Sequence, residues 1–188
     1  MKLNRIKKLC RDRCRVDLYT RRDGRQFISD GVGIWPVDEQ IYLTEGSIRT
    51  IFDVPMEKWE GDWSYQGFDY GRDADAETGG IPESLLDDIG DPAETKFLPQ
   101  DQRIISPWGE LMLYKELDGE RHLWAPTAQL TACPDWVSNF ALRETPGGLR
   151  ALAVYENMLL GALIVVPGSG IQREIQEGLR RLSEREVM

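Results

Sequence analysis

Apolar residues recur at helical spacing at the start of the chain. Leu3, Ile6, Leu9 and Cys10 share one face of a helix over residues 3–14, and lysines and arginines fill most of the other positions. This amphipathic pattern predicts a helix that covers part of a core.

The pattern then changes to the shorter runs that are typical of strands. Residues 16–20 alternate, a return strand begins at Phe27, and a third strand is expected over residues 32–37. Asp23-Gly24 lies between the first two strands, and this dipeptide is a strong hairpin signal. We therefore expect a β-hairpin directly after the helix.

Two short helices are predicted next. Thr44 or Ser47 can cap a helix that ends near Phe52, because a hydroxyl can accept a hydrogen bond from a free N–H of the first turn. Pro55 suits the first position of a further helical turn that ends near Trp59.

The second half of the chain is rich in strand patterns. Its last apolar run is hydrophobic on both faces, which predicts a central strand covered on both sides. The expected strands are residues 110–117, 122–124, 139–144, 149–156 and 158–166. A closing helix follows, because Ile171, Ile175, Leu179 and Leu182 recur on one helical face.

Together these elements predict a single α+β domain over residues 1–188. We expect a twisted, mainly antiparallel sheet packed by the N- and C-terminal helices. Residues 61–101 break the pattern, because glycine, proline and acidic residues mix there without periodicity. That segment is predicted to be a long acidic loop or insert, with one helical turn at Leu85, Leu86 and Ile89.

A short motif recurs 95 residues apart. Leu-Tyr followed by Asp-Gly stands at residues 18–19 and 23–24, and again at 113–114 and 118–119. A duplicated strand–turn–strand unit would produce this match, and so would two unrelated Asp-Gly hairpins.

Charge is distributed unevenly along the 188 residues, whose net charge is −9. Residues 1–25 hold ten Lys/Arg and three Asp/Glu, whereas residues 53–101 hold three basic and fourteen acidic residues. The hydrophobic fraction of 41% is that of a globular protein. A net acidic surface repels phosphates, so only the basic N-terminal segment is a candidate for binding nucleic acid.

The acidic segment carries aromatic residues, which makes it a candidate partner-binding site. Tryptophan and tyrosine dominate the energetics of protein interfaces, and carboxylates steer association with a basic partner. The predicted anchors are Trp59, Trp63, Tyr65, Phe68 and Tyr70, and the predicted steering charges are Asp69, Asp73, Asp75 and Glu77. A solvated acidic loop without a partner is the simpler interpretation of the same charges.

The basic segment supports a first alternative, in which the chain binds DNA. Arg11, Arg15 and Arg22 are the predicted phosphate contacts. These arginines have neither a helix-turn-helix context nor interleaved aromatic residues. They could equally offset the acidic segment within the same molecule.

A second alternative is a small enzyme that uses Cys133 and His122, the one histidine of the chain. A zinc site built from these two residues with Cys10 and Cys14 is disfavoured, because the spacing lacks a second close ligand pair. We expect no metal and no cofactor.

The compartment is predicted from the cysteines and the ends. Three cysteines are an odd count, which favours a reducing cytosol over a disulfide framework. The first 15 residues lack the apolar core of a signal peptide, and the longest apolar run is too short to cross a membrane. We expect a cytoplasmic protein with no membrane contact, and the oligomeric state stays open.

The chain also resembles a group of small accessory proteins of phages and mobile elements of Firmicutes. The residues that carry the resemblance are 1–10, Leu18-Tyr19, Asp23-Gly24, Ser29-Asp30-Gly31, Trp35-Pro36, Ile51-Phe52-Asp53, Ala153-Val154-Tyr155 and Val166-Pro167. The resemblance implies an accessory protein in the cytoplasm of a bacterial host. It brings with it no functional residue.

Some phage proteins of this size inhibit host defence, including anti-CRISPR proteins that block nucleases. The resemblance therefore implies a non-enzymatic protein that binds and inhibits a host protein, in the sharpest version a nucleic-acid-binding defence nuclease. In the DNA-binding alternative, the chain would be a phage DNA-transaction accessory protein.

Overall fold

The computed structural model of the chain describes residues 2–72, 80–88, 96–107, 109–135, 137–168, 171–175 and 177. The first half holds three helices and four strands in the described residues. They are α1 (Leu3–Arg13), β1 (Arg15–Thr20), β2 (Gln26–Ser29), β3 (Gly33–Pro36), α2 (Glu45–Phe52), α3 (Met56–Gly61) and β4 (Ser64–Asp69).

The second half consists mainly of strands. Its elements are the 3-10 turn η1 (Glu83–Leu86), β5 (Lys96–Ser106), β6 (Gly109–Glu116), β7 (His122–Pro126), the 3-10 turn η2 (Ala128–Ala132), β8 (Asn139–Glu144), β9 (Arg150–Glu156) and β10 (Leu159–Val165). Residues 171–175 and 177 are helical.

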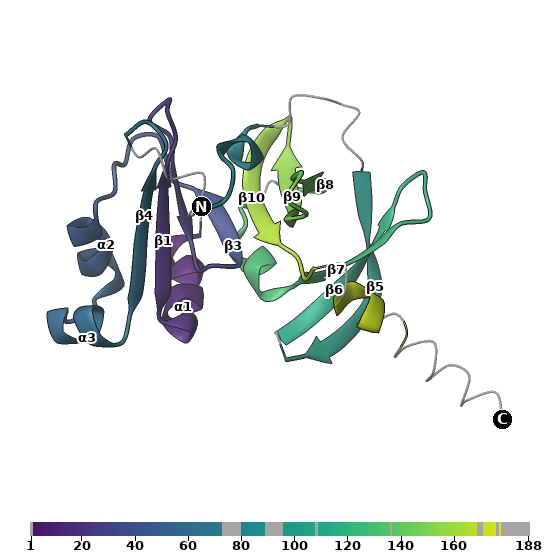
Figure 1. The fold of residues 1–188 in the computed structure, drawn as a ribbon, viewed down its shortest axis with the longest axis horizontal. Coiled ribbons are helices and arrows are strands. Elements are labelled where there is room, and N and C mark those ends of the chain that lie inside the picture. The colour runs from purple at the N-terminus through teal and green to yellow at the C-terminus, as the bar shows by residue number, and fades with distance from the viewer. Residues whose placement is uncertain are drawn as a thin grey trace.

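One ten-stranded sheet runs through the molecule, and Figure 1 shows it with the helices of the first half at one end. The strand order is β4-β1-β2-β3-β10-β9-β8-β5-β6-β7. β1 and β4 pair in parallel, and the other described pairs are antiparallel. The predicted α+β class, with helices towards both termini, is confirmed.

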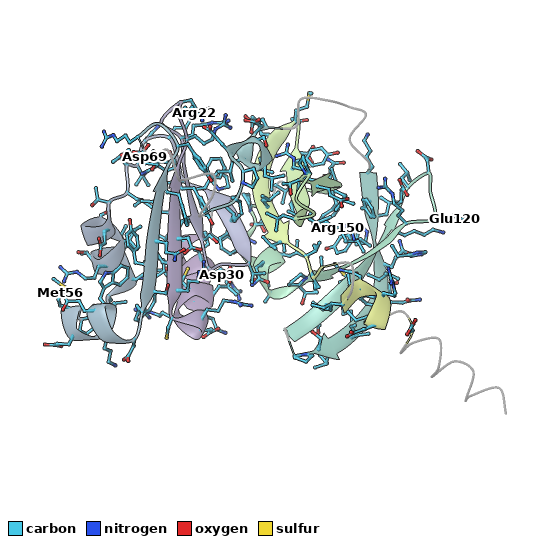
Figure 2. All side chains as sticks on the ribbon, viewed as in Figure 1. Arg22, Asp30, Met56, Asp69, Glu120 and Arg150 are labelled. Atoms are coloured by element: carbon cyan, nitrogen blue, oxygen red, sulfur yellow. The ribbon has the colours of Figure 1, made fainter. Side chains whose placement is uncertain are left out.

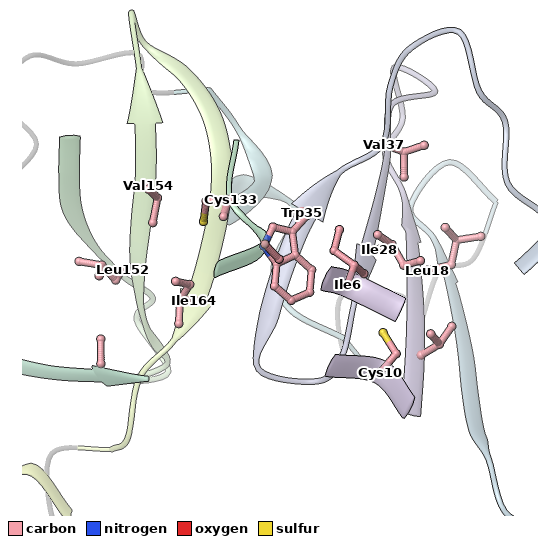
Figure 3. Packing of buried hydrophobic residues seen from close by; sticks show 14 of the residues in the cluster. Ile6, Cys10, Leu18, Ile28, Trp35, Val37, Cys133, Leu152, Val154 and Ile164 are labelled. Atoms are coloured by element: carbon pink, nitrogen blue, oxygen red, sulfur yellow. The ribbon is translucent and has the colours of Figure 1, made fainter. Parts of the chain in front are cut away.

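The main core lies on one face of the sheet and continues from the first half of the chain into the second. Figure 3 shows Trp35 between Ile6 and Ile28 on one side and Ile164 and Cys133 on the other. Helices α1, α2 and α3 contribute buried side chains to this core, because their apolar stripes face the sheet.

The other face of the sheet is covered by residues 80–88, which we call the strap. Leu85 and Leu86 of η1 are buried there against Tyr19, Phe27 and Leu163. The predicted helical turn at Leu85 and Leu86 is therefore confirmed, while Ile89 lies outside the described residues.

Two elements within residues 61–101 were not predicted. β4 lies at the start of that segment and β5 begins near its end. Both strands are largely exposed, and the register of β5 with β6 shifts between Pro99 and Arg103, so neither strand produces the alternation that identifies a half-buried strand. The acidic segment is thus partly built into the sheet.

The two Asp-Gly motifs both form hairpins, but their registers differ. Thr20 pairs with Gln26 across residues 21–25, whereas Lys115 pairs with His122 across residues 116–121, a loop one residue longer. A one-residue change moves a strand's side chains to the opposite face. The repeated motif therefore does not mark two superposable copies of one unit.

No helix in the described ranges is both long enough and apolar enough to cross a membrane.

Candidate functional site

A cavity of about 400 Å³ lies at the tip of the β1–β2 hairpin, and we call it the hairpin pocket. One wall is residues 23–26 of the hairpin. The other is the loop between β3 and α2, through Val37, Asp38, Glu39, Ile41 and Tyr42. Its volume is within the range of small-ligand sites.

The buried side chain of Gln26 holds the loop in place. Its Oε1 accepts a hydrogen bond from the Leu43 N–H at 2.6 Å, and its Nε2 donates to the Leu43 carbonyl at 3.0 Å. Its own carbonyl accepts from the Val37 N–H at 2.8 Å. Val37 and Leu43 are buried, so both ends of the loop are fixed to the core.

The tip of the loop presents two apolar side chains to solvent. The Asp38 carboxylate accepts from the Gln40 N–H, and the Asp38 carbonyl accepts from the Ile41 N–H, which closes a turn. Ile41 is 48% exposed and Tyr42 is 63% exposed. A fixed loop with two exposed apolar residues is typical of a binding surface.

The pocket has an acidic lining. Its lining holds three carboxylates, Asp23, Asp38 and Glu39, and one cation, Arg25. Arg25 pairs with Asp23 at 3.1 Å and with Asp88 of the strap at 2.8 Å, and Arg21 pairs with Asp23 at 3.5 Å. Partial burial acts to raise the pKa of Asp23, but the Arg25 N–H and the guanidinium groups of Arg21 and Arg25 lower it overall. Asp23 therefore stays ionised.

Three of the predicted anchors pack together against α2, the helix that follows this loop. Trp59 stacks on Trp63 with ring centroids 5.7 Å apart and lies 5.6 Å from Tyr65, and its Nε1 donates to Glu45. Trp59 is buried, whereas Trp63 and Tyr65 are half-buried. The pKa of Tyr65 is raised by burial and then by the negative charges of Glu45 and Tyr42, so Tyr65 and Tyr42 interact electrostatically.

The other two predicted anchors lie on the opposite face of β4. Phe68 stacks on Tyr19 at 4.9 Å, and the hydroxyl of Tyr70 donates to the Ile81 carbonyl. Tyr70 is buried against the strap. The five aromatic residues therefore do not form one surface, and Trp59 and Tyr70 serve as core residues in this structure.

The predicted steering charges fall mainly outside the described residues. Asp73, Asp75 and Glu77 lie there. Asp69 is half-buried, accepts from the Gly71 N–H and pairs with Arg72 at 3.5 Å.

The predicted phosphate contacts are already engaged within the molecule. Arg11 donates to the Phe52 carbonyl, Arg15 pairs with Asp17, and Arg22 pairs with Glu83 of the strap. Figure 2 shows Arg22 near Asp69, at the end of β1 opposite to α1. The hairpin arginines thus offset part of the acidic segment, as the simpler interpretation expects.

The cysteines do not meet at a catalytic or metal site. Cys10 and Cys133 are buried and Cys14 is exposed. Burial raises the pKa of Cys133 to about 12, which suppresses the thiolate that a nucleophile needs. Within the described ranges, no three His, Cys, Asp or Glu side chains are grouped closely enough to hold a metal ion.

The predicted site residues did not include Asp38, Glu39, Ile41 or Tyr42. A usable signal was present, since Ile41 and Tyr42 stand between Pro36 and the Thr44 cap without belonging to any periodic run. Apolar residues in a fixed loop are available for contact with a partner.

A scan against protein-family models, a search of curated proteins and a search of solved structures each found no match to this chain.

Proposed function

We propose that this chain is a binding protein that contacts another protein through Ile41, Tyr42, Trp63 and Tyr65, which we call the Tyr42 face. The observation that carries the proposal is the exposure of Ile41 and Tyr42 on a loop held at both ends. A rigid aromatic residue loses little entropy on binding, so it is an efficient anchor.

The resemblance to phage and mobile-element proteins supports a host protein as the partner. In the sharpest version of the proposal, the partner is a defence nuclease whose basic surface is blocked by this acidic chain. The net charge of −9 favours such an encounter, since opposite charges speed association.

Capture from a host lysate with matched variants tests the proposal. Ile41→Ser/Tyr42→Ser removes the exposed apolar pair of the Tyr42 face. Leu98→Ser/Leu117→Ser is the control, because these leucines are similarly exposed on β5 and after β6. At least one protein held by the wild type and the control should be lost with the first variant, since an anchor contributes about 2 kcal/mol or more.

The proposal is wrong if every protein captured by the wild type is also captured by Ile41→Ser/Tyr42→Ser. If both variants lose the same captured proteins, the loss reflects a general decrease in surface hydrophobicity. This outcome also counts against the Tyr42 face.

The DNA-binding alternative rests on a different observation. Arg5 and Lys8 on α1 are exposed and have no ion pair among the described residues. Under this alternative, DNA affinity falls steeply with salt. Arg5→Gln/Lys8→Gln should then weaken DNA binding more than Arg15→Gln/Arg22→Gln, because Arg15 and Arg22 are engaged by carboxylates.

A further inference from the structure

We propose that the hairpin pocket receives an arginine or lysine side chain of the partner protein. This inference rests on the proposed function and assigns the chemistry of one contact within it. Three properties of the pocket carry it: unpaired carboxylates, an exposed aromatic wall and a fixed shape.

The carboxylates at the mouth are available to a cation. Asp38 and Glu39 are exposed and form no ion pair with any described residue. Arg25, the one cation in the pocket lining, already pairs with Asp23 and Asp88. It therefore does not compensate the negative charges of Asp38 and Glu39. An anionic ligand would meet a net negative lining, whereas a guanidinium or ammonium group would be attracted.

The apolar lining suits the rest of such a side chain. Tyr42 offers an aromatic face to a cation, an arrangement that contributes about 0.5–1 kcal/mol at exposed sites. Val37 and Ile41 can contact the methylene stem, because long basic side chains bury their stems along apolar surface. The lining therefore matches both the charged head and the aliphatic stem.

The pocket is formed before any partner arrives. Gln26 fixes the loop at Val37 and Leu43, and the turn at Asp38 fixes its tip. The binding energy is therefore not spent on ordering the loop. A bare metal ion does not fit, because the described acidic side chains here form no three-ligand group.

A nuclear magnetic resonance titration of the full ¹⁵N-labelled chain tests the inference. The probe is acetyl-Gly-Arg-Gly-amide, and its partner control is acetyl-Gly-citrulline-Gly-amide, which has nearly the same shape without the charge. The arginine peptide should shift the amide signals of residues 23–26 and 37–42 in a saturable way. The citrulline peptide should leave these signals unchanged.

Matched variants locate the effect. Asp38→Asn/Glu39→Gln should weaken arginine-peptide binding roughly fivefold, as expected for two exposed ion pairs. Asp118→Asn/Glu120→Gln makes the same change of charge on the β6–β7 hairpin, at the far end of the molecule (Figure 2), and should leave binding unchanged. The spectra themselves report whether each variant is folded.

Equal shifts with both peptides, no saturable shifts at the pocket, or equal weakening by both pairs of variants would overturn the inference. If the peptide fails while Ile41→Ser/Tyr42→Ser still loses the captured partner, the proposed function stands and this inference falls. If the peptide binds the pocket but Ile41→Ser/Tyr42→Ser captures the same proteins as the wild type, the proposed function is wrong instead.

Discussion

At the scale of single residues, buried Asp30 shows how side chains distant in sequence fix the fold. Its Oδ1 accepts from the Val32 and Gly33 N–H groups, and its Oδ2 accepts from Gln129 at 3.0 Å and pairs with Arg13 at 3.3 Å. The break between the strands on either side of Asp30 was predictable, since one strand was expected to begin at Phe27 and the next over residues 32–37. The contact with Gln129 was not, because no local pattern links residues 99 positions apart.

Asp17 gives a prediction about pH. It is buried on β1, and burial raises its pKa above the ordinary 3.8, although Arg15 opposes the shift. Between the two pKa values the folded state binds more protons than the unfolded chain, so the free energy of unfolding falls as the pH rises. In the Asp17→Asn variant, the free energy of unfolding should fall less over the same pH range.

Urea unfolding of wild type and Asp17→Asn at several pH values from 3.5 to about 7 measures this difference. Asp118→Asn, on an exposed hairpin, is the control. An equal fall in wild type and Asp17→Asn would contradict the prediction.

The cysteines give a second prediction at this scale. Cys14 is exposed, whereas burial raises the pKa of Cys10 and of Cys133. Iodoacetamide at neutral pH should therefore modify Cys14 first, and Cys10 and Cys133 only on unfolding. Mass spectrometry of timed samples checks the order. Rapid modification of Cys133 in the folded protein would revive the enzyme alternative with His122.

At the scale of elements, the strap shows how part of the acidic segment is joined to the sheet. Arg143 donates to the Leu85 carbonyl at 2.6 Å, Arg21 donates to the Leu86 carbonyl at 3.0 Å, and the Leu160 N–H donates to Asp88. These contacts join the hairpin arginines, β8 and β10 through one short segment. The acidic residues next to the buried leucines of the strap thus help to stabilise the fold.

Leu86→Ala tests the strap. Leu86 is fully buried, so its truncation should lower the free energy of unfolding by about 2–4 kcal/mol. Leu117→Ala, at an exposed position, should change it by less than about 0.5 kcal/mol. Chemical denaturation measures both values. A small effect of Leu86→Ala would show that the strap does not hold the sheet.

The helices and strands also show which elements the sequence patterns can predict. The helices over residues 3–14 and 44–52 and the strands of both hairpins were predictable, because their apolar periodicity matches their burial. The Thr44 cap is confirmed, with Ser47 as its reciprocal partner. β4 was missed because it is polar and pairs in parallel with a strand 49 positions earlier, Arg15 opposite Ser64.

At the scale of the whole molecule, the two halves of the sheet meet at β3 and β10. Only Ile34 and Gly33 of β3 pair there with Leu163 and Ile164 in the described register. A Cβ atom on Gly33 would lie 2.5 Å from the Trp35 ring and 2.7 Å from Gln129. Glycine is therefore required where the sheet, the core and η2 come together.

Gly33→Ala should lower the free energy of unfolding by about 1–3 kcal/mol, because the ring of Trp35 has to move. Gly61→Ala is the control, since nothing lies within 4 Å of its added Cβ. Because the main core spans both halves, fluorescence and circular dichroism should report one shared unfolding transition. Two separate transitions would contradict a single domain.

Photo-crosslinking in cells of the native host tests whether the Tyr42 face contacts a host protein. A photoreactive phenylalanine analogue is placed at Tyr42, at Lys8 of α1, or at Leu117 as an exposed control. Contact through the Tyr42 face should give one discrete protein adduct from position 42 and none from position 117. Nucleic-acid adducts from position 8, with no protein adduct from position 42, would contradict it.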